Sequence, residues 1–172
     1  GSGTYVHGGG EVTSDTIVVK VKESDDNTSF SSQTITITIT GTNDTPVLTV
    51  PTGGALTEGA STTTVTDTLS ASDAEAGSLT FSVVGETASA GVYSVTGTYG
   101  SISLNATTGA YTYTLNNSDA DTVALTSADI GTETFSVAVE DAEGATATGS
   151  LSFAITGTGI TITTIESKYQ QI

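Results

Sequence analysis

The sequence predicts an all-β protein of the sandwich class, and three observations carry that prediction. Apolar β-branched and aromatic residues recur at every second position over long stretches, which is the pattern of half-buried strands. Clusters rich in Gly, Thr, Asn and Asp interrupt these stretches every 8 to 15 residues, a spacing typical of the turns in a β-sandwich. No segment of the sequence carries an apolar stripe at the 3.6-residue period of a long helix.

The alternation is strictest over 34–40, where three isoleucines alternate with threonines. The strands that we expect from this period contain Ile35, Ile37 and Ile39; Ile17, Val19 and Val21; Ile102 and Leu104; Tyr111, Tyr113 and Leu115; Phe135, Val137 and Val139; Leu151, Phe153 and Ile155; and Ile160 and Ile162. A helical turn is expected only within 118–128, inside a long loop.

Two segments, 15–44 and 133–160, share one pattern of strand, acidic loop, strand and Thr-Gly-Thr. Their first strands align at an offset of 118 residues and their second strands at an offset of 116. Self-similarity at this distance indicates tandem units rather than a short-period solenoid. We therefore expect a complete unit over 43–158, preceded in 1–42 by the closing hairpin of an incomplete upstream unit. Residues 159–172 are expected to form one extra strand and a tail.

The predicted hairpin needs a cover, because an isolated two-stranded hairpin is only marginally stable in water and exposes its apolar face. Three covers are conceivable for the apolar residues of 17–21 and 35–39. They are further chain of the same polypeptide, the strand expected at 160–165, or a strand from another molecule.

Composition excludes several classes of function. The chain has 172 residues, with 3 Lys and Arg against 19 Asp and Glu, and its net charge is −16. Nucleic acid and anionic membrane surfaces would repel such a protein. It has no Cys, no Trp and one histidine, His7, in a glycine-rich stretch unsuited to hold a general base. No run approaches the roughly 20 apolar residues that cross a bilayer. We expect a non-catalytic protein without nucleic-acid partners or membrane insertion.

Four stretches together resemble a known family: TITGTND followed by Pro46-Val47, then LSASDAEAG, then GTYGSISLNATTGAYTYTLNN, then FSVAVEDAEGATATGSLSFAITGTG. They are similar to the VCBS repeat, a cadherin-like, immunoglobulin-like domain found in tandem in large secreted bacterial adhesins. The resemblance covers nearly all of 43–158, and its closing third recurs in 15–44. It implies an antiparallel Ig-like/cadherin-like β-sandwich, stiffened by calcium and displayed outside the cell, at its surface. One departure is that Gly159-Ile160 stand where Asn43-Asp44 stood.

Acidic residues gather in three predicted turns, and Ca²⁺ takes six to eight oxygen ligands of the kind that such turns supply. The candidate ligands are Asp25 and Asp26 in the hairpin loop, Asn43 and Asp44 in the linker, Glu58, Asp73 and Glu75, which the resemblance brings near the linker, and Asp141 and Glu143 in a third turn. The alternative is that these residues occupy turns only because turns are exposed and Asp favours them.

Two functions fit these observations. The first is a structural extender of a cell-surface adhesin, whose partners are neighbouring repeats of the same polypeptide and whose parent binds a surface or glycan target. The second is a self-assembling subunit of an extracellular filament or lattice. There, Ile160, Ile162 and Ile165 of one subunit would complete the sheet left open by residues 15–40 of an identical subunit, by β-strand addition. Ligand binding by the sandwich loops is a third, weaker alternative.

Overall fold

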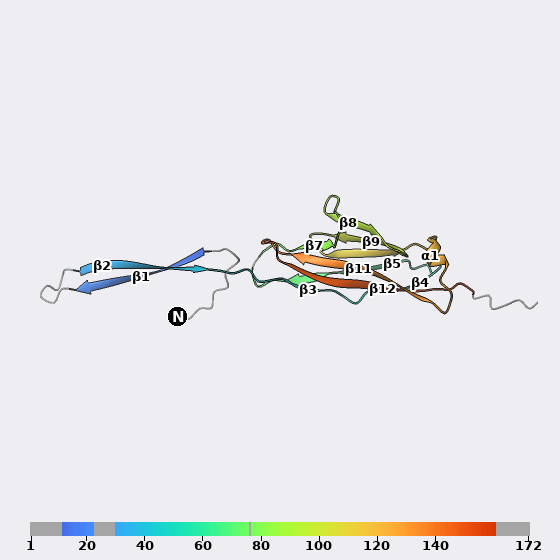
Figure 1. Ribbon diagram of the computed structural model, residues 1–172, viewed down its shortest axis with the longest axis horizontal. Coiled ribbons are helices and arrows are strands. Elements are labelled where there is room, and N and C mark those ends of the chain that lie inside the picture. The colour runs from blue at the N-terminus through green and yellow to red at the C-terminus, as the bar shows by residue number, and fades with distance from the viewer. Residues whose placement is uncertain (1–11, 23–29, 76, 161–172) are drawn as a thin grey trace, which may run out of the picture.

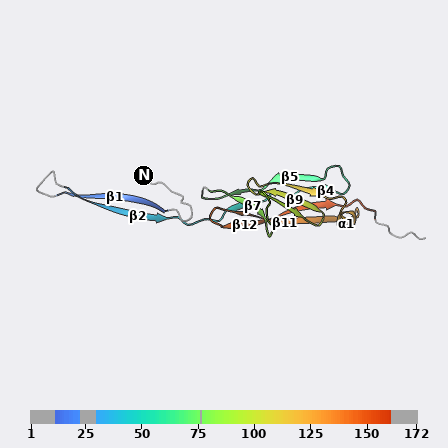
Figure 2. The same ribbon diagram turned by 90° about the horizontal axis from the view of Figure 1, so that it is seen from above.

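The computed structural model describes residues 12–22, 30–75 and 77–160 of the 172-residue chain. A long two-stranded hairpin and a β-sandwich lie end to end along the longest axis of the molecule (Figures 1 and 2). The segment 41–46 connects them. The hairpin therefore projects away from the sandwich instead of packing on one of its sheets.

Strands β1 (Val12–Lys22) and β2 (Phe30–Thr40) form the hairpin, and each has 11 residues. They pair antiparallel, with Ile17 opposite Ile35. Alternation of apolar and polar residues specifies this register, since a slip by one residue would move every isoleucine to the opposite face. The strands predicted around these two isoleucines are confirmed.

The sandwich consists of two four-stranded sheets, with the orders β5-β10-β9-β8 and β4-β12-β11-β7. The first sheet contains β5 (Thr64–Thr68), β8 (Val92–Thr96), β9 (Gly100–Asn105) and β10 (Ala110–Leu115). The second contains β4 (Ala55–Thr57), β7 (Thr80–Val83), β11 (Ile130–Glu140) and β12 (Thr146–Thr156). A short antiparallel pair, β3 (Val47–Thr49) with β6 (Ser70–Ser72), completes the fold. The predicted antiparallel sandwich is confirmed, except that β4 runs parallel to β12.

One apolar core fills the space between the two sheets. Alternate side chains of β9 and β10 face those of β11 and β12, as their period-two pattern predicts. The ring of Tyr113 stacks on that of Phe153 with centroids 4.2 Å apart, and Phe135 lies 6.1 Å from Tyr113. Stacked and edge-on pairs of this kind contribute on the order of 1 kcal/mol beyond the area that they bury. The aromatic residues of these strands therefore serve the core, as expected.

The helical turn predicted within 118–128 is α1 (Ala120–Val123). Asp119 caps it, because its carboxylate accepts a hydrogen bond of 2.9 Å from the backbone N–H of Asp121. In the described part of the chain, no helix is long and apolar enough to cross a membrane.

The predicted C-terminal strand falls largely outside the described residues, which end at Ile160. Ile160 itself is 88% exposed and belongs to none of the strands described above. Ile162 and Ile165 lie in 161–172, so the extra strand stays a prediction. The last described pairing is a parallel bridge between Thr126 and Gly159.

A buried carboxylate ties the β8–β9 turn to the opposite sheet. Glu133 of β11 is only 5% exposed. Its carboxylate accepts hydrogen bonds from the backbone N–H groups of Thr98 (3.0 Å) and Tyr99 (2.7 Å) and from the Tyr113 hydroxyl (3.4 Å). Burial, followed by the Glu133 charge, raises the pKa of Tyr113 above its ordinary value, so this hydroxyl keeps its proton and remains a donor.

We expect Glu133→Ala to lower the free energy of unfolding by about 1–3 kcal/mol, because three partly buried donors lose their acceptor. Urea unfolding in chelator measures this difference. The matched control is Glu140→Ala, which removes an exposed carboxylate from the end of the same strand. Equal stability losses in the two variants would contradict the role given to Glu133.

Candidate metal site

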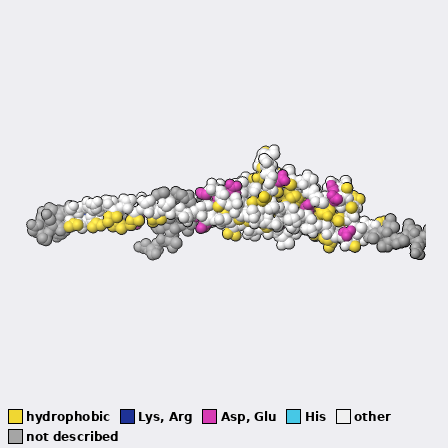
Figure 3. Space-filling view, viewed as in Figure 1, with side chains coloured by type: hydrophobic (Ala, Val, Ile, Leu, Met, Phe, Trp, Pro, Cys, Tyr) yellow, Lys and Arg dark blue, Asp and Glu magenta, His cyan; other side chains and the backbone are white. Residues whose placement is uncertain are grey.

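Three segments that lie far apart in the sequence meet at the end of the sandwich nearest the hairpin. The linker residues Asn43 and Asp44 come just before β3, and Asp73 and Glu75 come just after β6. Because β3 and β6 pair antiparallel, with Val47 opposite Ser72, the start of one strand lies beside the end of the other. Acidic side chains are visible at this end of the sandwich in Figure 3.

The third segment is the β11–β12 turn, which contributes Asp141. This carboxylate is 6% exposed. Its Oδ1 accepts hydrogen bonds from the backbone N–H groups of Glu143 (3.0 Å) and Ala145 (2.8 Å), and Gly144 takes the positive φ of 91° that the tight turn requires. Its Oδ2 accepts a hydrogen bond of 2.8 Å from the side-chain amide of Asn43. One carboxylate therefore orders the turn and ties the linker to it.

The neighbouring carboxylates are less well supplied with donors. Glu75 is 8% exposed, and its two oxygens share the backbone N–H of Asp44 at 3.3 Å each. Asp73 Oδ1 accepts a hydrogen bond of 3.0 Å from the backbone N–H of Ala74. The other oxygen of Asp73 and the amide oxygen of Asn43 are buried and have no hydrogen-bond partner within the described residues. Buried polar atoms of this kind need a partner, which water or a cation can supply.

The charge of the unit points to a cation. Residues 43–158 contain 13 Asp and Glu but no Lys, Arg or His, because the three lysines are Lys20, Lys22 and Lys168. Buried carboxylates in such a unit cannot form ion pairs with the unit's own side chains, and uncompensated buried charge is unfavourable. The pKa of Asp141 lies below its ordinary value, chiefly because of the Asn43 amide and further because of the backbone donors of the turn, while burial opposes the effect. Asp141 therefore stays ionised at neutral pH.

The residues at this end fit a hard cation better than a transition metal, since every side-chain group is an oxygen donor. In residues 12–22, 30–75 and 77–160, however, no three Asp, Glu or His side chains form a group that could hold a metal by themselves. An ion here would need the amide oxygen of Asn43, backbone carbonyls or water beside the carboxylates. Ca²⁺ accepts such mixed oxygen sets readily.

The structure places several of the predicted ligands at this end of the sandwich. The backbone N–H of Asp44 donates to Glu75, and the β3–β6 pairing puts Asp73 beside the start of β3. That these residues bind a metal stays a prediction. Asp141 joins them through Asn43, although the sequence pattern placed it in a separate cluster. A side-chain hydrogen bond therefore joins the linker to the third turn.

The placement of Glu58 near the linker is wrong. Glu58 follows β4, and its backbone N–H donates to the carbonyl of Thr156 at 2.9 Å. Its carboxylate accepts a hydrogen bond of 2.9 Å from the backbone N–H of Thr158. Because β4 runs parallel to β12, Glu58 lies beside the end of β12, whereas Asp141 lies near its start. An 11-residue strand spans about 35 Å, so the two carboxylates lie at opposite ends of the sandwich.

The remaining candidate ligands do not add to the site. Glu143 is exposed, and its contribution to the turn is its backbone N–H. Asp25 and Asp26 lie outside the described residues, so a site in the hairpin loop stays a prediction. Glu133, by contrast, is a buried carboxylate that the sequence analysis did not identify. The one sign of its place on the core face of β11 is its spacing of two from Phe135.

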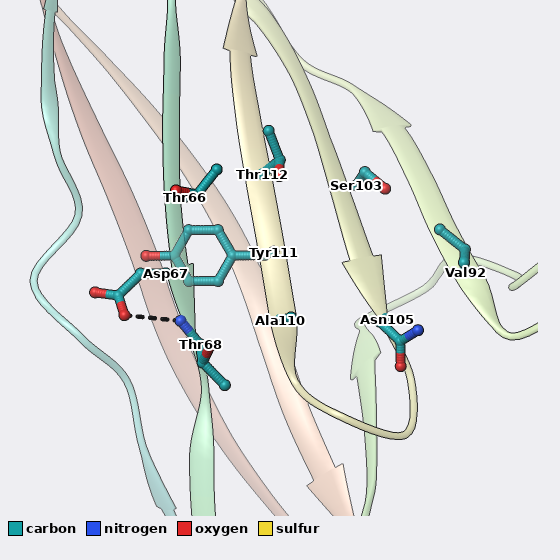
Figure 4. Close-up of a pocket in the computed structure, with 9 residues that line it drawn as sticks. All are labelled: Thr66, Asp67, Thr68, Val92, Ser103, Asn105, Ala110, Tyr111 and Thr112. Carbon is teal, nitrogen blue, oxygen red and sulfur yellow. Dashed lines mark hydrogen bonds between the residues drawn. The ribbon is translucent and has the colours of Figure 1, made fainter.

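A depression of about 480 Å³ lies on the outer face of the β5-β10-β9-β8 sheet, away from the linker (Figure 4). Thr66, Thr112 and Ser103 lie across it on three adjacent strands. Its carboxylate, Asp67, accepts a hydrogen bond of 2.8 Å from the backbone N–H of Thr68. Tyr111 also lines it but is only 3% exposed, so the ring offers no free face on which a sugar could stack.

We expect Asn43→Ala to raise the pKa of Asp141 toward the ordinary value of about 3.9, since the Asn43 amide is the largest cause of its lowering. A lowered pKa in the folded state stabilises the fold above the ordinary pKa, and this stabilisation is lost as the pH falls below about 4. A carboxyl-carbon NMR titration in chelator measures the pKa of Asp141 directly. Asn116→Ala, at the opposite end of the sandwich, is the control. An unchanged Asp141 pKa in Asn43→Ala would disprove the coupling.

Among solved structures, the chain is similar to extracellular domains of protocadherins and cadherins. A protocadherin gammaB7 structure of domains EC3–6, described as a cis-dimer, aligns at 13% identity with a TM-score of 0.44, covering 85% of this chain and 33% of that one. Mouse cadherin-23 domains EC22–24 align at 15% identity with a TM-score of 0.40, covering 84% of this chain and 41% of that one. This chain thus spans less than half the length of either. A comparison with curated protein sequences finds no match.

Residues 43–157 match the family of bacterial cadherin-like domains. The matched range begins at Asn43, includes all of the sandwich strands and ends directly after β12. It covers more than half of the chain. The narrower resemblance to the VCBS repeat stays a prediction. On this match, the chain belongs to the family of bacterial cadherin-like domains.

Proposed function

We propose that the chain is a non-catalytic extender module of a secreted bacterial surface adhesin, in which Ca²⁺ stiffens the junction between the hairpin and the sandwich. Cadherin-like domains are extracellular structural and adhesion modules that typically bind calcium. The observation that carries the proposal for this chain is a set of buried oxygens with too few donors, in a unit without a single cationic side chain. The residues that would hold the ion are Asn43, Asp44, Asp73, Glu75 and Asp141.

The ion supplies positive charge and oxygen coordination where the protein supplies neither a cation nor enough donors. Asp73 and Glu75 come from the end of β6, whereas Asn43 and Asp44 come from the linker. A ligand shared by both segments resists bending at the linker, because bending would separate oxygens that the ion holds together. Neutralising part of the net charge of −16 also relieves repulsion within the folded unit.

The linker is the point at which such stiffening matters most. Residues 41–46 form no strand or helix and connect two elongated bodies that lie along one axis (Figure 1). The direct side-chain tie from the linker to the turn is the hydrogen bond between Asn43 and Asp141. With this joint fixed, consecutive modules add their lengths, which extends the reach of a binding region elsewhere in the same polypeptide. A surface or glycan target would be bound by that region.

A second candidate, the self-assembling filament subunit, has one observation in its favour. Isoleucines and valines of the hairpin are 43–65% exposed along one face. The donor strand that this function requires would come from 161–172, outside the described residues. The extender function rests on more of the described structure and is the one we adopt.

We expect Ca²⁺ to raise the melting temperature of the full chain, and Asp73→Asn with Glu75→Gln to weaken Ca²⁺ binding by at least about tenfold. In chelator, the melting temperature of this variant should match or exceed that of the unaltered chain, because repulsion is reduced. Titration calorimetry and thermal unfolding, each with Ca²⁺ and with chelator, measure these effects.

The matched control is Glu58→Gln with Glu86→Gln, which removes the same number of charges away from the linker. We expect it to leave Ca²⁺ affinity unchanged. Small-angle scattering adds a readout of stiffness: the maximum dimension of the unaltered chain should be better defined and longer in Ca²⁺ than in chelator. Absence of Ca²⁺ binding, or equal weakening in both double variants, would overturn the proposal.

A further inference from the structure

The N-terminal hairpin is a structural copy of the hairpin that closes the sandwich. β1 and β11 have 11 residues each, as do β2 and β12. Adding 118 to the residue numbers of β1 gives the bounds of β11, and adding 116 to those of β2 gives the bounds of β12. The register is also the same, since Ile17 pairs with Ile35 and the corresponding residues Phe135 and Leu151 pair with each other. Two separately formed hairpins thus share strand length, register and apolar phase.

The two hairpins differ in what covers their apolar faces. In the closing hairpin, the six core positions are at most 6% exposed: Phe135, Val137, Val139, Leu151, Phe153 and Ile155. The corresponding positions of the N-terminal hairpin are 43–65% exposed: Ile17, Val19, Val21, Ile35, Ile37 and Ile39. We call this second set the open face. It forms a continuous apolar row along the hairpin (Figure 3). Exposed apolar rows of this length mark interaction surfaces.

The edges of the two hairpins differ in the same way. β11 pairs with β7 over 137–140, and β12 pairs with β4 over 154–156. The corresponding stretches of the N-terminal hairpin are 19–22 and 38–40. Within the described residues, β1 and β2 form a sheet of two strands. Among the described residues, no further strand pairs with 19–22 or 38–40, the stretches that would take an antiparallel neighbour on β1 and a parallel one on β2.

An acidic residue on the open face matches the buried carboxylate of the sandwich. Asp15 precedes Ile17 by two positions and corresponds to Glu133 at the same offset of 118. Asp15 is exposed, and its carboxylate accepts a hydrogen bond of 2.8 Å from the backbone N–H of Thr16. Glu133 instead holds the β8–β9 turn through two backbone N–H groups. A partner with such a turn would offer Asp15 the same donors.

We propose that the open face docks the remaining strands of a second cadherin-like sandwich, for which β1 and β2 supply the closing hairpin. The partner is an apolar sheet like that of β9 and β10, flanked by one antiparallel and one parallel edge strand. This inference rests on the extender function proposed above. A complete second copy of this chain fits less well, because its β9–β10 face is already covered by its own β11 and β12.

A hybrid chain built from the molecule's own parts tests this docking. Residues 43–129 are joined directly ahead of residues 12–172, because residue 129 immediately precedes β11 in the complete unit. The whole described protein is retained, and the added segment supplies β3 to β10. We expect hydrogen exchange of the hairpin amides in 12–22 and 30–40 to slow by at least about 100-fold relative to the unaltered chain.

Two variants of the hybrid distinguish a hairpin that packs loosely on the added strands from one that does not dock at all. Ile17→Phe with Ile37→Phe restores the rings that Tyr113 contacts in the complete sandwich, and should increase protection if the simple hybrid packs loosely. Ile37→Thr with Ile39→Thr makes the open face polar and should abolish protection. Rapid hairpin exchange in both the simple and the ring-restored hybrids would overturn the proposal.

Measurements in chelator and in Ca²⁺ keep this test separate from that of the calcium function. Protection of the hairpin in chelator supports docking even if no calcium binds, and calcium binding without hairpin protection supports only the extender function. Sedimentation of the unaltered chain addresses the self-assembly alternative. A dimer or filament that is lost in Ile37→Thr with Ile39→Thr would overturn the proposal and identify a second copy as the occupant of the open face.

Discussion

Burial of the apolar face of the closing hairpin is the constraint on which the rest of this structure depends. Phe135 of β11 and Phe153 of β12 lie edge-on to each other, and Phe153 also stacks on Tyr113 of β10. Both strands also pair outward, with β7 and β4. β11 also connects two buried carboxylates, since Glu133 near its start holds the β8–β9 turn and Asp141, directly after its end, holds the linker. Packing of the β11–β12 hairpin therefore determines the positions of the core rings, the β8–β9 turn and the linker together.

The two ends of this strand show opposite ways of accommodating buried negative charge. Glu133 has two backbone donors and a tyrosine hydroxyl, which suffice for a carboxylate without a cation. At the linker end, Glu75 shares one donor between its oxygens, and one oxygen of Asp73 has no partner among the described residues. The first arrangement is complete within the protein, whereas the second leaves buried oxygens without hydrogen-bond partners among the described residues.

Sequence reasoning succeeded for the strands of the hairpin and of the sandwich core, which follow from local periodicity. The strict alternation of 34–40 and of 133–139 predicts strands and faces, because side chains of a strand alternate by geometry. It failed for Glu58, since its place depends on β4 running parallel to β12, a long-range choice with no local signal. Asp141 was likewise separated from Asn43 by 98 residues in sequence, although a 2.8 Å hydrogen bond joins them. The order and direction of the strands determine which loops lie together, and a single sequence does not specify that order.

The two ends of the sandwich differ in how well their carboxylates are supplied with hydrogen-bond donors. At the far end, Glu58 already accepts hydrogen bonds from the N–H and hydroxyl of Thr158, and Gly159-Ile160 stand where Asn43-Asp44 stand at the linker. Among the described residues, the Glu58 carboxylate at the far end thus has donors that Asp73 Oδ2 at the linker end does not have. Calcium would then couple the sandwich to the hairpin before it, while the copied register of that hairpin couples it to a further sheet. Resistance to bending extends along such a chain only where both couplings hold, because a hairpin that moves freely against the next sheet leaves a flexible joint.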